Sequence, residues 1–235
     1  MSTLLTGLYL YYKLDESSWT TANDSVGSIN WTLIGSPTFT SWWKINNWLY
    51  YDWSARRHID IWTQIAGSFW DNDFSFSCWY KPDSITQEPT FLLCYNRDIQ
   101  VRYWWNNDLQ IGIRNWSVFH TASAWAVLSN NNRSHIVATR SKTNWMTIYH
   151  NGVLEWTNSY TGNGLITTDG DFDTTKIWRR YSLSPARDFR LDWTLDEVWI
   201  RSKELTASEV SELYNWWKWL QYPFQKSTWN FLLMF

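Results

Sequence analysis

Short stretches in which apolar and polar residues alternate run along most of the chain. Between Asp73 and Tyr80, one face would carry Phe74, Phe76, Cys78 and Tyr80, and the other Ser75, Ser77 and Trp79. This period of two predicts a half-buried β-strand. Similar runs predict further strands at Leu8–Leu14, Leu49–Tyr51, His58–Ile61, Phe91–Tyr95, Ile99–Tyr103, Leu109–Ile113, His135–Arg140, Met146–Tyr149, Lys176–Ile177 and Leu195–Ile200. Short strands at such regular spacing are typical of an all-β sandwich.

Two local signals are stronger than the rest. Asn151-Gly152 lies between Met146–His150 and Val153–Glu155 and predicts a hairpin with a type I′ turn, because both turn residues tolerate positive φ. Thr206 and Glu209 have the spacing of a capping box, which predicts one short helix at about residues 206–215.

Composition narrows the class of protein. The 235 residues carry 20 basic and 22 acidic side chains, a net charge of −2, which gives no support for nucleic-acid binding. We find no signal peptide in the first fifteen residues and no apolar run long enough to span a bilayer.

We predict one domain over residues 1–224 and a poorly ordered tail over 225–235. Cys78 and Cys94 both fall in strand-like runs, where a buried thiol is favoured over the alternative, a disulfide.

Tryptophan is the anomaly of the composition. The chain has 22 tryptophans and only nine glycines, whereas ordinary proteins contain about 7% glycine. One explanation is an aromatic surface that stacks on sugars. A sugar platform needs only a few tryptophans on one face, whereas these are spread through every expected turn.

Four blocks of sequence resemble the laminin G-like, concanavalin A-like jelly-roll family. The strongest runs from Asp192 to Val210 (DWTLDEVWIRSKELTASEV) and is similar to the closing strand and helix of the family. The others are the opening strand with its loop at 11–27, the strand at Phe74–Pro82 and the hairpin at Met146–Leu154. The resemblance implies a two-sheet antiparallel jelly-roll β-sandwich and says little about function.

Against the family pattern, most tryptophans stand where glycine is usual. Asn or Asp precedes Trp in the dipeptide slot of Asn-Gly and Asp-Gly turns at positions 31, 48, 53, 116, 145, 193 and 216. A residue with a Cβ costs about 1–2 kcal/mol where the turn needs positive φ. Ten such sites would cost about as much as the ~5–15 kcal/mol that keeps a domain folded. Our hypothesis is that most of the tryptophans are UGA codons that mean glycine and have been translated as tryptophan. Only Trp79 falls where the family itself has tryptophan. We therefore expect exposed turn positions, several at positive φ, for Trp19, Trp31, Trp53, Trp193 and Trp216, with Trp79 as the aromatic core residue.

The resemblance also implies a calcium site. In the family, an Asp of the early loop and an Asp of the closing strand lie near one rim, and the matching residues are Asp24 and Asp196, with Asn23 as a helper. Oxygen ligands of this kind suit Ca²⁺ in a structural role. The alternative is that Asp24 initiates a turn and Asp196 accepts hydrogen bonds from a neighbouring loop.

The leading function is a non-catalytic binding module that recognises carbohydrate or a cell-surface partner. Some relatives are glycoside hydrolases, which need two carboxylates flanking the scissile bond. The adjacent Asp196 and Glu197 would point to opposite faces of a strand, so we expect no catalytic residue and no enzyme. A chain without an export signal suggests a phage protein displayed on a virion or, within an assembly, at a cell surface. A purely structural decoration protein is the alternative from another class.

Overall fold

The computed structural model describes a set of ranges to which the structural statements below refer. They are residues 3–17, 20–34, 37–41, 47–51, 58–61, 72–83, 90–94, 99–104, 108–115, 118–125, 128–144, 146–158, 175–177 and 193–214.

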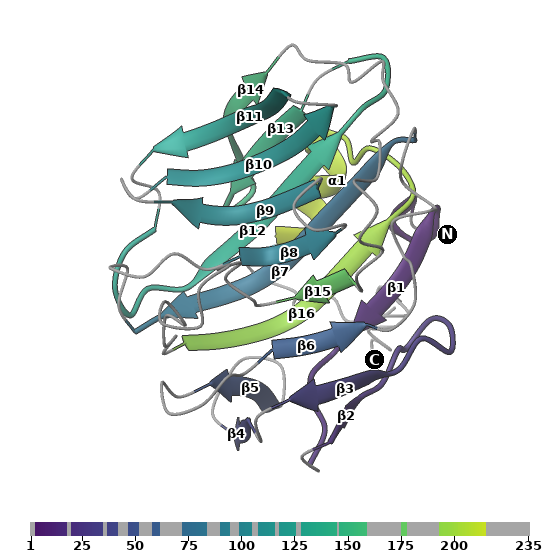
Figure 1. The fold of residues 1–235 in the computed structure, drawn as a ribbon, viewed down its shortest axis with the longest axis vertical. Helices are drawn as coiled ribbons and strands as arrows, with labels where there is room; N and C mark the ends of the chain where they lie inside the picture. The colour runs from purple at the N-terminus through teal and green to yellow at the C-terminus, as the bar shows by residue number, and fades with distance from the viewer. Residues whose placement is uncertain are drawn as a thin grey trace, which may run out of the picture.

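Two antiparallel sheets of eight strands each stack face to face (Figure 1). The first sheet has the order β14 (Val153–Asn158), β13 (Met146–His150), β12 (Ser134–Arg140), β7 (Phe74–Pro82), β16 (Trp193–Arg201), β5 (Asn47–Tyr51) and β4 (Thr38–Ser41), with β1 (Leu8–Tyr12) also paired to β16. The second has the order β11 (Val118–Trp125), β10 (Asp108–Asn115), β9 (Ile99–Trp104), β8 (Thr90–Cys94), β15 (Thr175–Ile177), β6 (His58–Ile61), β3 (Trp31–Ile34) and β2 (Thr21–Ala22). The expected jelly-roll sandwich is confirmed.

The main core lies between the sheets. Strand β7 contributes Phe74, Phe76, Cys78 and Tyr80, each at most 3% exposed, so the predicted apolar face of this strand is confirmed. Cys78 is a free, buried thiol, and burial raises its pKa well above the ordinary value. The side chain of Cys94 lies outside the described residues.

A second, smaller core covers the outer face of the first sheet. It packs the 3₁₀ turn η1 (Thr3–Leu5) and helix α1 (Ala207–Tyr214) against Tyr11, Val137 and Trp199. The expected capping box is present, because the Thr206 amide donates to Glu209 at 3.0 Å and the Glu209 amide donates to the Thr206 hydroxyl at 3.3 Å. In the part of the chain that is described, no helix combines the length and apolarity needed to cross a bilayer.

The Asn151-Gly152 hairpin also forms as expected. The two residues have φ of 51° and 80°, the positive pair that a type I′ turn requires. A Cβ at Gly152 would lie 2.8 Å from the Tyr214 ring of α1, so the turn and the helix pack closely.

The tryptophans correct two of our expectations. Trp31 lies in strand β3, is 1% exposed, and its ring centroid is 3.4 Å from that of Tyr12, so the prediction of an exposed turn is wrong. Trp193 begins strand β16 and is likewise not in a turn. Trp199 is 3% exposed and Trp79 half-buried, so Trp79 is not the one aromatic core residue. On β3, Trp31 and Leu33 are buried and Thr32 between them is exposed, so the indole of Trp31 occupies an inward position of the strand. Trp19, Trp53 and Trp216 lie outside the described residues.

No tryptophan among the described residues has a positive φ. The described non-glycine residues with positive φ are Leu14, Asn131, Asn151 and Glu197. Backbone strain at tryptophan, which we expected at several turns, is therefore absent from the described ranges.

Candidate functional site

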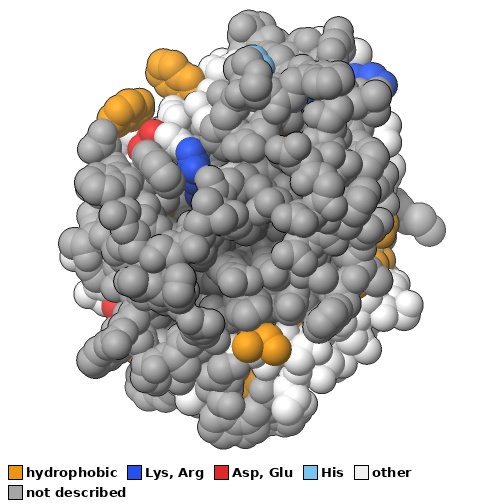
Figure 2. Space-filling model, viewed as in Figure 1, with side chains coloured by type: hydrophobic (Ala, Val, Ile, Leu, Met, Phe, Trp, Pro, Cys, Tyr) orange, Lys and Arg blue, Asp and Glu red, His pale blue; other side chains and the backbone are white. Residues whose placement is uncertain are grey.

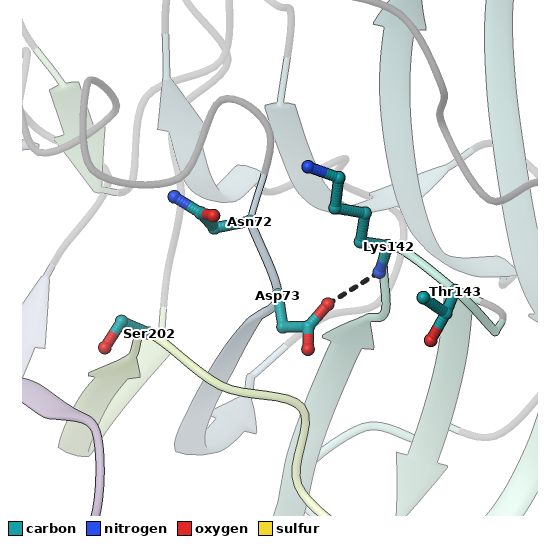
Figure 3. Close-up of a pocket in the computed structure, with 5 residues that line it drawn as sticks. All are labelled: Asn72, Asp73, Lys142, Thr143 and Ser202. Atoms are coloured by element: carbon teal, nitrogen blue, oxygen red, sulfur yellow. Dashed lines mark hydrogen bonds between the residues drawn. The ribbon is translucent and has the colours of Figure 1, made fainter.

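One open polar cavity lies at the rim of the sandwich, and three separate segments build it. Asn72 and Asp73 precede β7, Lys142 and Thr143 belong to the turn between β12 and β13, and Ser202 follows β16. The cavity has a volume of ≈ 460 Å³, and Figure 3 shows the five side chains arranged around it. We call this set of five residues the rim pocket.

Hydrogen bonds fix the wall of the rim pocket. The Lys142 amide donates to Asp73 Oδ1 at 2.6 Å, which ties the β12–β13 turn to the start of β7. Ser141 Oγ accepts the amide of Asn144 at 3.2 Å, within that turn. Arg140 Nη1 donates to the Asn72 carbonyl at 3.1 Å from beneath. The backbone that presents these side chains is therefore held in one arrangement.

The chemistry of the rim pocket suits a ligand rich in hydroxyl groups. It offers a carboxylate, an ammonium group, an amide and two hydroxyls, a mixture of donors and acceptors with opposite charges in balance. Among the lining residues that the structure describes, Asp73 alone has a carboxylate, whereas glycoside hydrolysis uses two.

Asp24 organises the loop between β2 and β3 and ties it to β1. Its Oδ1 accepts the amides of Tyr11 at 3.1 Å and Val26 at 3.0 Å, and its Oδ2 accepts the amides of Gly27 at 3.0 Å and Ile29 at 3.4 Å. Both oxygens thus serve the backbone, the role that we named as the alternative to calcium binding.

Asn23 is exposed and bound to Glu16. The Asn23 amide donates to Glu16 Oε1 at 2.7 Å, and Asn23 Nδ2 donates to the same oxygen at 3.2 Å. The charge of Glu16 is also one of the causes that raise the pKa of Asp196, after burial and the charges of Glu197 and Asp15.

Asp196 lies at a β-bulge. The register of β16 against β7 shifts between Asp196 and Trp199, and Glu197 takes φ of 50° there. Burial raises the pKa of Asp196 well above its usual value, and the nearby charges of Glu197 and Asp15 raise it further. Within the described ranges, no group of three His, Cys, Asp or Glu side chains could hold a metal ion. The calcium site stays a prediction.

The Glu197 side chain turns into the second core. It is 3% exposed, and its Oε2 accepts the hydroxyl of Tyr11. The sequence motif Asp-Glu-Val therefore serves the local structure of β16, with Glu197 joining that strand to β1.

Sequence reasoning missed all five residues of the rim pocket. Each is a common surface residue type without a motif, and the three segments meet only because β7 pairs with both β12 and β16. The one usable signal was that all three segments flank expected strands, where loops gather at the ends of a sandwich.

Comparison with known families agrees with this architecture. A laminin G-type family model described as "Concanavalin A-like lectin/glucanases superfamily" matches residues 54–211. The match covers more than half of the chain, and the chain therefore belongs to this superfamily. Comparison with the curated proteins found no match.

Several solved structures share the fold. One comes from work on the cell entry of botulinum neurotoxin type C, which depends on two ganglioside molecules (17% identity, 89% of this chain, 51% of that chain, TM-score 0.67). Another is the binding domain of botulinum neurotoxin DC in complex with SialylT (15% identity, 91% and 52%, TM-score 0.67). A third is that domain in complex with rat synaptotagmin II (15% identity, 89% and 51%, TM-score 0.67). The chain spans about half the length of these proteins, and such identities show the fold alone.

Proposed function

We propose that this chain is a non-catalytic carbohydrate-binding module and that the rim pocket is its binding site. The observation that carries the proposal is the rim pocket itself, an open cavity of ≈ 460 Å³ lined by polar side chains. Its volume falls within the ~300–1,000 Å³ usual for small-ligand sites. The structural neighbours that bind gangliosides or SialylT support carbohydrate as the class of ligand.

A glycan array tests this function. We expect the chain to retain at least one glycan, and Lys142→Ala and Thr143→Val to weaken binding about tenfold or more, the equivalent of ~1.4 kcal/mol. Ser208→Ala, an exposed serine on α1, is the matched surface control and should bind like the unaltered chain.

The alternatives have different outcomes in the same experiment. A folded chain that retains no glycan contradicts the proposal and favours a structural decoration role. Capture of a cell-surface protein without any glycan favours a protein partner, of the kind seen in the synaptotagmin complex. Release of reducing sugar from a polysaccharide panel would indicate a glycoside hydrolase.

Calcium and virion display remain parts of the proposal that need their own tests. A structural Ca²⁺ held by Asp24, Asp196 and Asn23 predicts a higher melting temperature in calcium than in EDTA, and no such difference in Asp196→Asn. Equal melting temperatures in the unaltered chain would refute it. Display on a virion predicts tail, baseplate or capsid genes beside this one.

We also propose that most of the tryptophans are glycines in the natural protein. Trp199 supports this view, because three buried polar atoms beside it have no hydrogen-bond partner among the described residues. Ser77 is its partner on β7, with an unpaired Oγ, and Arg201 stacks at 4.3 Å on its ring with Nη1 and Nη2 unpaired. Native interiors contain few such groups, since each costs about 1–3 kcal/mol.

Trp31 shows the same conflict. Its indole Nε1 is buried and has no partner in the described part of the chain, whereas a buried indole N–H usually finds one. The coding DNA decides the question: UGA at most of the 21 positions other than Trp79 supports the proposal, and UGG there refutes it.

A further inference from the structure

Two residues of the rim pocket, Asp73 and Ser202, carry side-chain oxygens that a ligand can reach. Asp73 directly precedes β7 and is half-buried, whereas Ser202 directly follows β16 and is exposed. The two strands pair antiparallel with Ser75 opposite Arg201, so both residues come to the same end of the first sheet. Both line the open cavity of ≈ 460 Å³.

The hydrogen bonds of these two residues leave acceptors rather than donors. Asp73 Oδ1 accepts the backbone amide of Lys142 at 2.6 Å, and Figure 3 shows no bond from the other four residues to the second carboxylate oxygen. The Ser202 hydroxyl donates to the Gly7 carbonyl at 3.3 Å. A hydroxyl that has given its one proton keeps its lone pairs. Asp73 Oδ2 and Ser202 Oγ are therefore both suited to a ligand that donates.

Backbone contacts hold both acceptors in place. The Ser202 amide donates to the Gly7 carbonyl at 2.7 Å, and Gly7 itself has φ of 68°. A Cβ at Gly7 would lie 3.2 Å from the side chain of Lys203, so the N-terminal turn packs closely on the segment that carries Ser202. Acceptors fixed in advance lose less entropy when a ligand binds.

The charges in the rim pocket disfavour a charged ligand. An anion there meets the carboxylate of Asp73, and a cation meets the ammonium group of Lys142. Glu204, which accepts Asn144 Nδ2 at 3.2 Å, adds a second carboxylate beside the turn that carries Lys142. In Figure 2 the few charged side chains of the described residues lie scattered over the face drawn, rather than gathered into one patch of like charge. Since like charges brought together cost binding energy, a neutral ligand fits best.

We propose that the rim pocket selects a neutral saccharide, and that Asp73 Oδ2 and Ser202 Oγ accept the protons of two sugar hydroxyls. A hydrogen bond to an ionised oxygen is roughly twice as strong as a neutral one, so Asp73 makes the stronger contact. The five residues of the rim pocket include no tryptophan, so their chemistry is the same whichever tryptophans are glycines in the natural protein.

This inference rests on the proposed carbohydrate-binding function and adds the class of sugar and the residues that select it. Its first test is a glycan array that carries neutral, sialylated and amine-bearing glycans, probed with the whole chain. We expect the glycans that are retained best to be neutral. A sialylated or amine-bearing glycan retained best overturns the inference and leaves the proposed function standing.

The second test substitutes Asp73 and measures the affinity for the neutral glycans on the same array. Asp73→Asn keeps the size of the side chain and one oxygen for the Lys142 amide, but it replaces the second acceptor by a donor. We expect binding to weaken about tenfold or more. Asp83→Asn is the matched control at the other end of β7, where Asp83 pairs with Lys81 at 3.4 Å, and should bind like the unaltered chain.

Ser202→Ala tests the second contact. It removes the hydroxyl and keeps the backbone bond to Gly7, so binding should weaken about threefold or more. Ser202→Thr, which restores a hydroxyl, should recover part of the affinity. Near-ultraviolet circular dichroism establishes that each variant is folded.

The outcomes separate this inference from the proposed function. Weaker binding in Asp73→Asn with unchanged binding in Asp83→Asn supports the inference. Unchanged binding in Asp73→Asn overturns it, and the proposed function stands if Lys142→Ala still weakens binding. If the folded chain retains no glycan on the array, both proposals fail.

Discussion

Replacing Trp199 by glycine distinguishes whether tryptophan or glycine is the native residue at this position. For a native buried tryptophan, truncation costs about 3–5 kcal/mol in free energy of unfolding. Glycine in a strand adds a further ~0.5–1 kcal/mol. If glycine is native, the same change opens space beside Ser77 Oγ and both Nη atoms of Arg201, three unpaired groups worth about 1–3 kcal/mol each. We therefore expect Trp199→Gly to leave the free energy of unfolding within ~1 kcal/mol or to raise it.

Urea denaturation followed by far-ultraviolet circular dichroism measures this difference. Trp79→Gly is the matched control, because Trp79 stands where the family itself has tryptophan and stacks 5.8 Å from Tyr214 and 5.0 Å from His135. This control should lose about 3 kcal/mol or more. A comparable loss in Trp199→Gly would refute the reasoning about the unpaired groups.

Three further predictions follow from local geometry. Gly152→Ala should lower the free energy of unfolding by about 1–2 kcal/mol, because φ is 80° and the new Cβ meets Tyr214 at 2.8 Å; an unchanged urea midpoint would contradict this. Glu209→Gln should cost about 1 kcal/mol at pH 7. Burial by itself would raise the pKa of Glu209, but the hydrogen bonds from Lys203 and Thr206 outweigh it, so the pKa lies below its ordinary value. The stability that the charged carboxylate contributes is therefore lost as the pH falls through this pKa, and the difference in free energy of unfolding between Glu209→Gln and the unaltered chain should vanish in acid. Burial lowers the pKa of His135 to about 3, whereas the unfolded chain binds the proton near pH 6.5, so the unaltered chain should lose stability as the pH falls between these values. His135→Phe should lose less stability over this range, and identical pH profiles of the urea midpoints would contradict the prediction.

The alternation of apolar residues predicted much of the fold. β6 matches its predicted bounds, and the capping box located α1 because both depend on residues close in sequence. β11 was missed because its inward residues Ala122 and Ala124 are small and give a weak apolar signal. β3 was missed because Trp31 was interpreted as a turn residue.

The candidate sites were less accessible to sequence reasoning. Nothing in the sequence around Glu197 predicts the β-bulge there. The expectation that Asp196 and Glu197 point to opposite faces assumed a regular strand and did not include the bulge. The hydrogen bond from Arg102 to Gln110 needs the register of β9 against β10, which places these two residues opposite each other. Such registers come from tertiary packing and turn geometry together.

Glycan binding by the folded chain, measured on an array in calcium and in EDTA, tests the proposed function most directly. We expect at least one glycan to be retained, and Lys142→Ala to weaken this binding about tenfold or more while Ser208→Ala does not. A folded chain that retains no glycan in either condition would contradict the central claim that this sandwich is a carbohydrate-binding module.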